Sequence, residues 1–183
     1  MKKGLVKLMA CVMIMGSLVA CGEKKEEAKE NTVKNDVKVE ALTAAVKEEL
    51  GENYWPTKQL TESEAADLYQ LTLDNAEEVI AEVPMMATNA DMILIVKAKE
   101  GKVEDVKKEV EALRQSKVDD TMQYPMNIQK IAASSVNVVG NYVCYVQLGG
   151  SAADLETDEE IRTGCEADNK KAMEVIENQL KSE

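Results

Sequence analysis

The segment Asp91–Lys99 is the feature that most constrains the fold of this chain. Successive side chains of a strand point to opposite faces of the sheet. One face of this segment carries Met92, Leu94, Val96 and Ala98, and the other carries Ile93, Ile95 and Lys97. Because both faces are largely apolar, we expect the segment to form a central strand.

The rest of the chain alternates between helical and strand periodicity. Apolar residues at helical spacing predict helices over 39–50, 61–69, 103–114, 125–131 and 167–180. Alternating residues predict strands over 78–83, 91–99, 136–139 and 142–148, the last two joined by a turn at Gly140-Asn141. The order α-α-β-β-α-α-β-β-α predicts an α+β fold: two layers, with a mostly antiparallel sheet of about four strands and helices packed mainly on one face.

The N-terminus has the pattern of an export signal. Lys2, Lys3 and Lys7 precede thirteen uncharged residues from Leu8 to Ala20, a run too short to span a bilayer of about 30 Å. The run ends in Leu18-Val19-Ala20-Cys21, which resembles the bacterial lipobox. The resemblance implies cleavage between Ala20 and Cys21 and attachment of diacylglycerol to the Cys21 thiol. The alternative is a plain secretory signal in which the cysteine is incidental.

These signals divide the chain into three parts. Residues 1–20 are predicted to be a lipoprotein signal peptide, and 21–38 a lipidated cysteine with a flexible tether. Ten of the sixteen residues 23–38 are charged and three are apolar, so this segment lacks the apolar side chains that would order it. Residues 39–183 are predicted to form a single α+β domain ending in a helix. The expected localisation is the outer face of the cell membrane, with the lipid on Cys21 as the membrane contact.

Composition excludes several classes of function. The chain of 183 residues has 22 Lys+Arg, 34 Asp+Glu and no His, for a net charge of −12. Nucleic-acid binding needs a basic surface, so we expect none. The absence of histidine removes the commonest general base and zinc ligand. Walker, dinucleotide-binding and nucleophile-elbow patterns are absent as well, and we expect no cofactor and no metal.

Several blocks of the sequence resemble one bacterial family. These blocks are 50–56, 82–86, 89–99, 120–127 and 140–149. In this order they are similar to the domain of unknown function 4358, found in lipoproteins of gut-type Clostridia. The resemblance covers about residues 40–150 and implies a Gram-positive cell-surface lipoprotein. It implies no reaction and no catalytic residues.

The residues themselves offer few candidate sites. Tyr54-Trp55 and Tyr124-Pro125 form a candidate contact surface, although the first pair is more typical of a plug at the edge of the core. Cys144 and Cys165 could form a disulfide, whereas the position of Cys144 within a strand favours a buried, inert thiol.

Two further patterns have both a functional and a structural interpretation. The methionines at 85, 86, 92, 122 and 126 could form a soft binding surface or a copper site, but replacement of the missing phenylalanines in the core is the preferred interpretation. The acidic stretch 154–160 resembles the start of a calcium loop. It lacks that loop's glycine at the sixth position and its glutamate at the twelfth, so a solvated surface stretch is the preferred interpretation.

Taken together, these features predict a non-catalytic binding module that is anchored at the outer face of the cytoplasmic membrane. Its partner would be an envelope protein or a ligand that the sequence does not identify. Two alternatives remain open: a small ligand-binding component of a transport or sensing system, and an envelope enzyme that uses carboxylates or lysine.

Overall fold

A computed structural model describes residues 33–182 of the chain. Its helices are α1 (Val39–Leu50), α2 (Glu62–Tyr69), α3 (Val103–Asp119), α4 (Pro125–Ala133) and α5 (Asp158–Leu180), with short 3-10 turns at Gly51–Asn53 and Leu73–Asn75. Its strands are β1 (Lys58–Leu60), β2 (Ala76–Val83), β3 (Met92–Ala98), β4 (Ser135–Val139) and β5 (Tyr142–Gln147). This content confirms the predicted α+β class.

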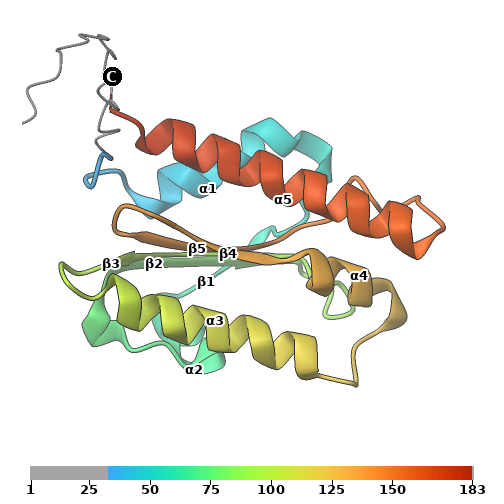
Figure 1. Cartoon of the computed structure of the whole chain (residues 1–183), viewed down its shortest axis with the longest axis horizontal. Helices are drawn as coiled ribbons and strands as arrows, with labels where there is room; N and C mark the ends of the chain where they lie inside the picture. The colour runs from blue at the N-terminus through green and yellow to red at the C-terminus, as the bar shows by residue number, and fades with distance from the viewer. Residues whose placement is uncertain (1–32, 183) are drawn as a thin grey trace, which may run out of the picture. The chain divides into compact units, whose positions relative to one another are not determined.

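The strands form one sheet in the order β1-β2-β3-β5-β4, and each neighbouring pair is antiparallel (Figure 1). β3 lies at the centre, as the two apolar faces of Asp91–Lys99 predicted. The turn between β4 and β5 falls at Gly140, whose φ of 57° is a left-handed conformation that glycine adopts without strain. The sheet has a fifth strand, β1, beyond the expected four. The sequence did not predict it, because its three residues are too few to give an alternating pattern.

Helices cover both faces of the sheet, and the prediction of two layers with helices mainly on one face is wrong (Figure 1). α1 and α5 pack over one face, which presents Ile93, Ile95 and Cys144. α2 and α3 pack over the other, which presents Leu94 and Tyr145. The reason is the one that made β3 central: a strand that is apolar on both faces needs cover on both sides.

The starts of α5 and α1 depend on polar side chains. α5 begins nine residues earlier than the predicted 167, because Thr157 and Glu160 form a reciprocal capping box inside the acidic stretch 154–160. α1 has no cap from its own N-cap side chain. Instead, Glu78 of β2 accepts the backbone N–H of Val39 at 3.2 Å and pairs with Lys38. Burial alone would raise the pKa of Glu78. The hydrogen bonds from Lys38 and from the Val39 N–H, with the positive charge of Lys38, outweigh burial and lower this pKa.

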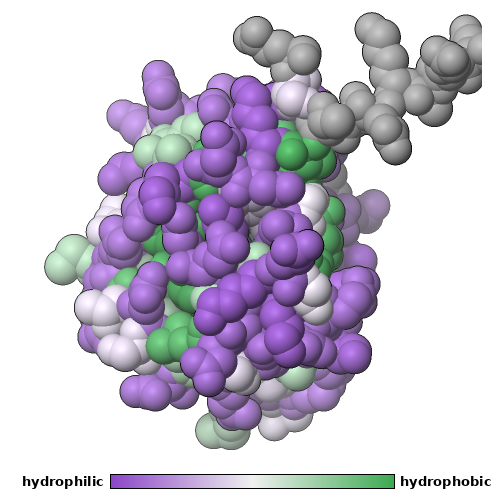
Figure 2. Space-filling view, turned by 90° about the vertical axis from the view of Figure 1, so that its left-hand side faces the viewer, coloured by the Kyte–Doolittle hydropathy of each residue, from purple (hydrophilic) through white to green (hydrophobic). Residues whose placement is uncertain are grey.

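The ordered domain begins before the predicted boundary at Val39. Val33 forms a β-bridge with Lys181 beyond α5, and the backbone N–H of Lys34 donates to the carbonyl of Leu180. Val37 packs against the core, and its carbonyl accepts the Tyr142 hydroxyl at 2.7 Å. Residues 33–38, which were assigned to the tether, therefore lie against the domain. Figure 2 views the domain from the left-hand side of Figure 1 and shows a face covered mostly by hydrophilic side chains.

Candidate functional site

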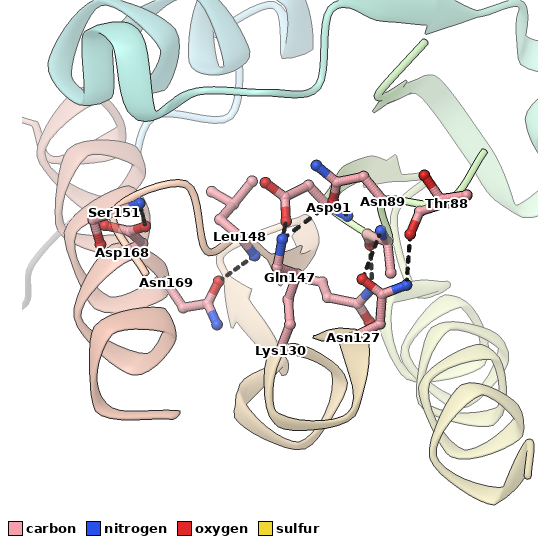
Figure 3. Close-up of polar contacts among 11 residues, drawn as sticks. Thr88, Asn89, Asp91, Asn127, Lys130, Gln147, Leu148, Ser151, Asp168 and Asn169 are labelled. Carbon is pink, nitrogen blue, oxygen red and sulfur yellow. Dashed lines mark hydrogen bonds and ion pairs between the residues drawn. The ribbon is translucent and has the colours of Figure 1, made fainter. Parts of the chain in front are cut away.

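A buried polar cluster lies at the end of the sheet where β3 begins and β5 ends (Figure 3). The antiparallel register sets Met92, the first residue of β3, opposite Gln147, the last residue of β5. Asp91 therefore lies beside the chain as it leaves β5 toward Gly149. α4 packs against α5 at this end and directs Lys130 toward Asp91. Segments distant in sequence meet here: the β2–β3 loop, α4, the β5–α5 loop and α5 itself.

The centre of the cluster is an ion pair between the Lys130 ammonium and the Asp91 carboxylate, whose side chains are 7% and 0% exposed. Burial raises the pKa of Asp91, while the ammonium and the backbone N–H of Gly149 oppose that shift. Lys130 also donates to the Asn89 amide oxygen at 3.1 Å and lies 5.2 Å from the centre of the Trp55 ring. The ammonium therefore has three neighbours: a carboxylate, an amide oxygen and an aromatic ring.

Amide side chains fix the β2–β3 loop against α4 and β5. Asn127 of α4 accepts the backbone N–H of Ala90 at 3.3 Å and donates to the carbonyl of Thr88 at 2.9 Å. Gln147 of β5 donates to the carbonyl of Ala90 and accepts the hydroxyl of Tyr145. Each amide uses both its donor and its acceptor, so the backbone groups of Thr88 and Ala90 that they contact have partners within the cluster.

α5 holds the other side of the cluster with two consecutive polar residues. Asn169 accepts the backbone N–H of Leu148 at 2.8 Å and donates to the carbonyl of Ala133 at 2.9 Å, which ties β5 to the end of α4. Asp168 accepts the backbone N–H of Ser151 at 3.0 Å. The first part of the β5–α5 loop, residues 148–151, is therefore held against α5.

Gly149 and Gly150 allow this loop to pass close to its neighbours. A Cβ on Gly149 would lie 2.5 Å from the Cys165 sulfur and 2.8 Å from Lys130 Cε. A Cβ on Gly150 would lie 2.0 Å from the backbone oxygen of Asn53, an atom that cannot move without its chain. Neither position has room for a side chain in this arrangement.

The cluster borders a cavity of about 240 Å³. Its walls are mostly apolar, and Lys130 and Asn127 add polar groups from the cluster. Large side chains of its apolar wall come from five different segments: Trp55, Met86, Met126, Leu155 and Ile161. Several of them are exposed at the mouth, Met86 by 68%, Met126 by 66% and Trp55 by 36%. We call this feature the Trp55 pocket.

The predicted contact surface is divided by the fold. Trp55 lines the pocket, whereas Tyr54 is buried in the core and donates its hydroxyl to Glu82 at 2.7 Å. Tyr124 is exposed and Pro125 occupies the first turn of α4, but neither lines the pocket. The helix that they begin nevertheless carries Met126 into the pocket wall.

The preferred interpretation of the methionines as core residues holds for only one of the five. Met92 is buried in β3. Met85, Met86, Met122 and Met126 are largely exposed, because they lie in the β2–β3 loop, before α4 and at its start, where no layer of the fold covers them. Two of them, Met86 and Met126, line the Trp55 pocket. Flexible, polarizable side chains in such positions suit a binding surface.

The two cysteines of the domain are free thiols in different parts of the core. Cys144 faces the α1–α5 layer, and Cys165 lies in a small cluster with Ala133 and Ala152. Burial raises the pKa of Cys144 to about 12 and that of Cys165 to about 11. The disulfide is therefore not formed in this structure.

The acidic stretch 154–160 has no calcium-loop arrangement. Its last three residues form the first turn of α5, where negative charge interacts favourably with the helix dipole. Among residues 33–182, no group of three or more His, Cys, Asp or Glu side chains is placed to hold a metal ion.

Sequence reasoning missed the polar residues at the centre of the cluster. Asp91, Asn127 and Gln147 lie inside the blocks that resemble the family, but nothing in their spacing indicated that they meet. Lys130 and Asn169 lie on the predicted helices with no local pattern to mark them. The available signal was weak: a polar residue directly before an apolar strand, and a lysine beside Ile131 on a buried helix face.

A second hollow, of about 380 Å³, lies between α2 and α3 and is lined by Leu68, Tyr69, Gln70, Lys108 and Glu109, among others. It contains no buried polar cluster like the one beside the Trp55 pocket. We therefore place the candidate site at the Trp55 pocket.

The predicted signal peptide, with its cleavage site at Ala20 and Cys21, lies outside the described residues. Within 33–182, none of the helices combines the length and the apolar character needed to cross a membrane.

Comparison with known proteins identifies a family but no function. The sequence model of "Domain of unknown function (DUF4358)" matches residues 49–148, more than half of the chain. No curated protein and no solved structure matches the chain. The matched region contains Trp55, Asp91, Lys130 and Gln147, so most of the cluster belongs to the family domain.

Proposed function

The chain belongs to the family of the domain of unknown function DUF4358, and we propose that it is a non-catalytic, lipid-anchored surface protein that binds a partner through the Trp55 pocket. The proposal has two parts. The first is anchoring through Cys21 at the outer face of the cytoplasmic membrane of a Gram-positive bacterium. The second is the use of the pocket end of the domain as a contact surface for a protein of the cell envelope.

One observation carries the second part: exposed apolar side chains gather around the Trp55 pocket. Trp55, Met86 and Met126 line the pocket with exposed side chains, and Met85 is exposed beside Met86 in the β2–β3 loop. Exposed apolar groups rimmed by polar residues are typical of interaction sites. Tryptophan and methionine are enriched at protein interfaces, and tryptophan is among the residues that contribute most to binding energy.

The position of the N-terminal segment supports anchoring on the side away from the pocket. Val33 lies beside Gly140 at one end of β5, whereas Gly149 lines the pocket just beyond the other end. Six residues of strand separate these ends by about 20 Å. The twelve residues from Cys21 to Val33 can span at most about 40 Å, so the lipid would hold this end of the domain near the membrane. The pocket would then face outward.

The contacts of Lys130 favour binding over catalysis. A catalytic lysine needs an accessible nitrogen, and a general base needs a free lone pair near the substrate. Here the ammonium pairs with the Asp91 carboxylate, donates to the Asn89 amide oxygen and lies near the Trp55 ring, and the side chain is almost fully buried. Asp91 has no exposed side-chain surface with which to contact a substrate directly.

The size of the pocket also bears on the alternative of a small ligand-binding component. Sites for small molecules usually enclose about 300–1,000 Å³. The Trp55 pocket, at about 240 Å³, lies below this range. It is better matched to a side chain inserted from a partner protein than to a complete metabolite.

The proposal is tested by photo-cross-linking in the producing cell. A diazirine amino acid replaces Met126 at the mouth of the pocket or, as a matched control, Glu100 in the turn after β3 at the other end of the sheet. We expect a discrete protein adduct from position 126 and none from position 100. Equal adducts from both positions, or none from position 126, would contradict binding through the pocket.

The anchoring part has its own test. Cys21→Ala should prevent cleavage of the precursor by lipoprotein signal peptidase and remove the lipid label. Cys11→Ala, the control within the predicted signal peptide, should change neither the cleavage nor the label. Normal processing of Cys21→Ala would refute the anchor without affecting the pocket.

A further inference from the structure

We infer that the occupant of the Trp55 pocket is a basic segment of the partner protein that inserts one large apolar side chain. This inference rests on the proposed function and adds the chemistry of the partner. It combines two independent features: the apolar cavity, and the distribution of charge around its mouth.

The interior of the pocket selects an apolar group. Its wall is formed by Trp55, Met86, Met126, Leu155 and Ile161. The one cation that lines it, Lys130, is already paired with Asp91 and also contacts the Asn89 amide oxygen. A charged group inserted here would lose its hydration and find no free counter-charge. An apolar side chain loses no hydrogen bond and gains contact with the wall.

The β5–α5 loop, which borders the pocket at Leu155, continues into the acidic first turn of α5. Leu155 lines the cavity, and acidic residues stand on both sides of it in sequence: Asp154, Glu156, Asp158, Glu159 and Glu160. All five are exposed. Within the described chain, none of them forms an ion pair with a lysine or arginine. The nearest basic residue along the chain, Arg162, pairs with Glu166 at 2.9 Å.

This charge distribution specifies the flanks of the inserted segment. Glu160 is held by the capping box with Thr157, whereas the other four carboxylates, on the segment that borders the apolar cavity, attract lysine or arginine and repel acidic groups; the net charge of −12 acts in the same direction. Such rim charges mainly raise the association rate and are screened by salt, whereas the inserted side chain mainly slows dissociation. The acidic stretch that resembled a calcium loop would therefore attract the basic residues of the partner to the pocket.

The experiment uses the fluorescence of Trp55, the only tryptophan in the chain. The full chain in mild detergent is titrated with three synthetic twelve-residue peptides. The first has lysines around one central phenylalanine, the second has alanine in place of the phenylalanine, and the third has glutamates in place of the lysines. We expect a saturable change of Trp55 emission with the first peptide and at least tenfold weaker binding of the other two.

Matched variants assign the two parts of the site. Met126→Asp should weaken binding of the first peptide at least tenfold, whereas Met122→Asp, at an exposed position outside the pocket, should change it less than twofold. Glu156→Lys should weaken binding several-fold at 50 mM salt and much less at 500 mM. Glu100→Lys changes the net charge equally at the other end of the sheet and should have little effect.

Two outcomes would overturn the inference. Equal binding of the alanine peptide would show that no apolar side chain is required, and equal binding of the glutamate peptide would show that the rim does not select basic partners. Either result would leave the cross-linking at position 126 unaffected, so a failure of the partner chemistry differs from a failure of the proposed function. Absence of any response to the lysine–phenylalanine peptide also counts against the inference.

Discussion

Replacement of Lys130 by methionine tests whether the buried ion pair holds the pocket end together. Methionine keeps most of the length of the side chain but removes the charge, so Asp91 is left buried without its counter-ion. Removing one partner of a buried pair costs about 3–5 kcal/mol, because the remaining charge is neither paired nor hydrated. For a domain of this size, that loss lowers Tm by roughly 6–20 °C.

The assay is urea and thermal unfolding of the full chain in mild detergent, followed by circular dichroism. Lys170→Met is the matched control, because Lys170 also lies on a helix and pairs with a carboxylate, Glu174, at 3.7 Å. That pair is exposed on both sides, so its loss should cost no more than about 0.5 kcal/mol. The comparison separates burial from ion pairing as such.

A double-mutant cycle with Asp91→Asn refines the result. If the pair acts as a unit, Asp91→Asn and Lys130→Met should each destabilise the domain, and the double variant should lose less than the sum of the two. The coupling should be about 2 kcal/mol or more. Additive losses would show that the two charges do not interact.

The pH dependence of Lys130→Met gives a further check. Burial already raises the pKa of Asp91, and loss of the ammonium removes an influence that opposes this shift. A carboxyl whose folded-state pKa lies above its unfolded value contributes stability that is fully present below the unfolded pKa and is lost as the pH rises through the folded pKa. The deficit of Lys130→Met should therefore be smaller at pH 5 than at pH 8. A deficit below about 1 kcal/mol at pH 8 would refute the reasoning.

Three further predictions concern other parts of the domain. Because burial raises the pKa of Cys144 to about 12 and of Cys165 to about 11, neither thiol should react with iodoacetamide at pH 8 in the folded protein, and peptide mapping before and after denaturation checks this. Glu78→Gln should lower the free energy of unfolding by about 1 kcal/mol at pH 7, because Glu78 accepts the first N–H of α1. The pKa of Glu78 is lowered in the folded state, so the difference in stability from wild type should vanish as the pH falls through this folded-state pKa, which urea unfolding at several pH values checks. Gly150→Ala should cost about 1–3 kcal/mol in urea unfolding, because its Cβ would meet a backbone oxygen at 2.0 Å, whereas the looser contact of 3.0 Å at Gly164 should cost Gly164→Ala less.

The helices and strands could be predicted because their signals are local. A stripe such as Leu42, Val46 and Leu50 needs only neighbours along one helix to be recognised, and each of these residues is buried in the core. The alternation in Asp91–Lys99 likewise sorts its side chains onto the two faces that the structure shows. Where the local signal was short, as in the three residues of β1, the prediction failed.

The start of α5 shows how a composition argument can hide a local signal. The acidic residues at 154–160 were interpreted as a solvated stretch, although Thr157 and Glu160 have the spacing of a capping box. The same spacing at Thr61 and Glu64 forms the capping box at the start of α2. The capping box lies inside the acidic stretch, so one of its two residues also belongs to the pattern that indicates a solvated surface.

The candidate site could not be predicted, because its residues meet only through the register of the sheet. Asp91 and Gln147 are separated by more than fifty residues, and they approach because Met92 pairs with Gln147 across β3 and β5. A shift of that register by one residue would exchange the faces of β5 and separate the polar groups. Trp55 was singled out because it is a rare residue in a loop, whereas Lys130 resembled any other helical lysine.

The ion pair itself supports a role in binding over a role in stability alone. A buried pair can often be replaced by apolar residues of similar size with little loss of stability, because the desolvation of two charges offsets much of their attraction. An apolar pair would fill the space of Lys130 and Asp91, but it would not hold the Asn89 amide or attract the face of Trp55. The ammonium therefore positions Trp55 in the pocket wall and the β2–β3 loop that carries Met86. Apolar packing is less directional than these contacts and would fix both less well. We infer that the double variant of the stability cycle, even where it folds well, loses the Trp55 response to the lysine–phenylalanine peptide.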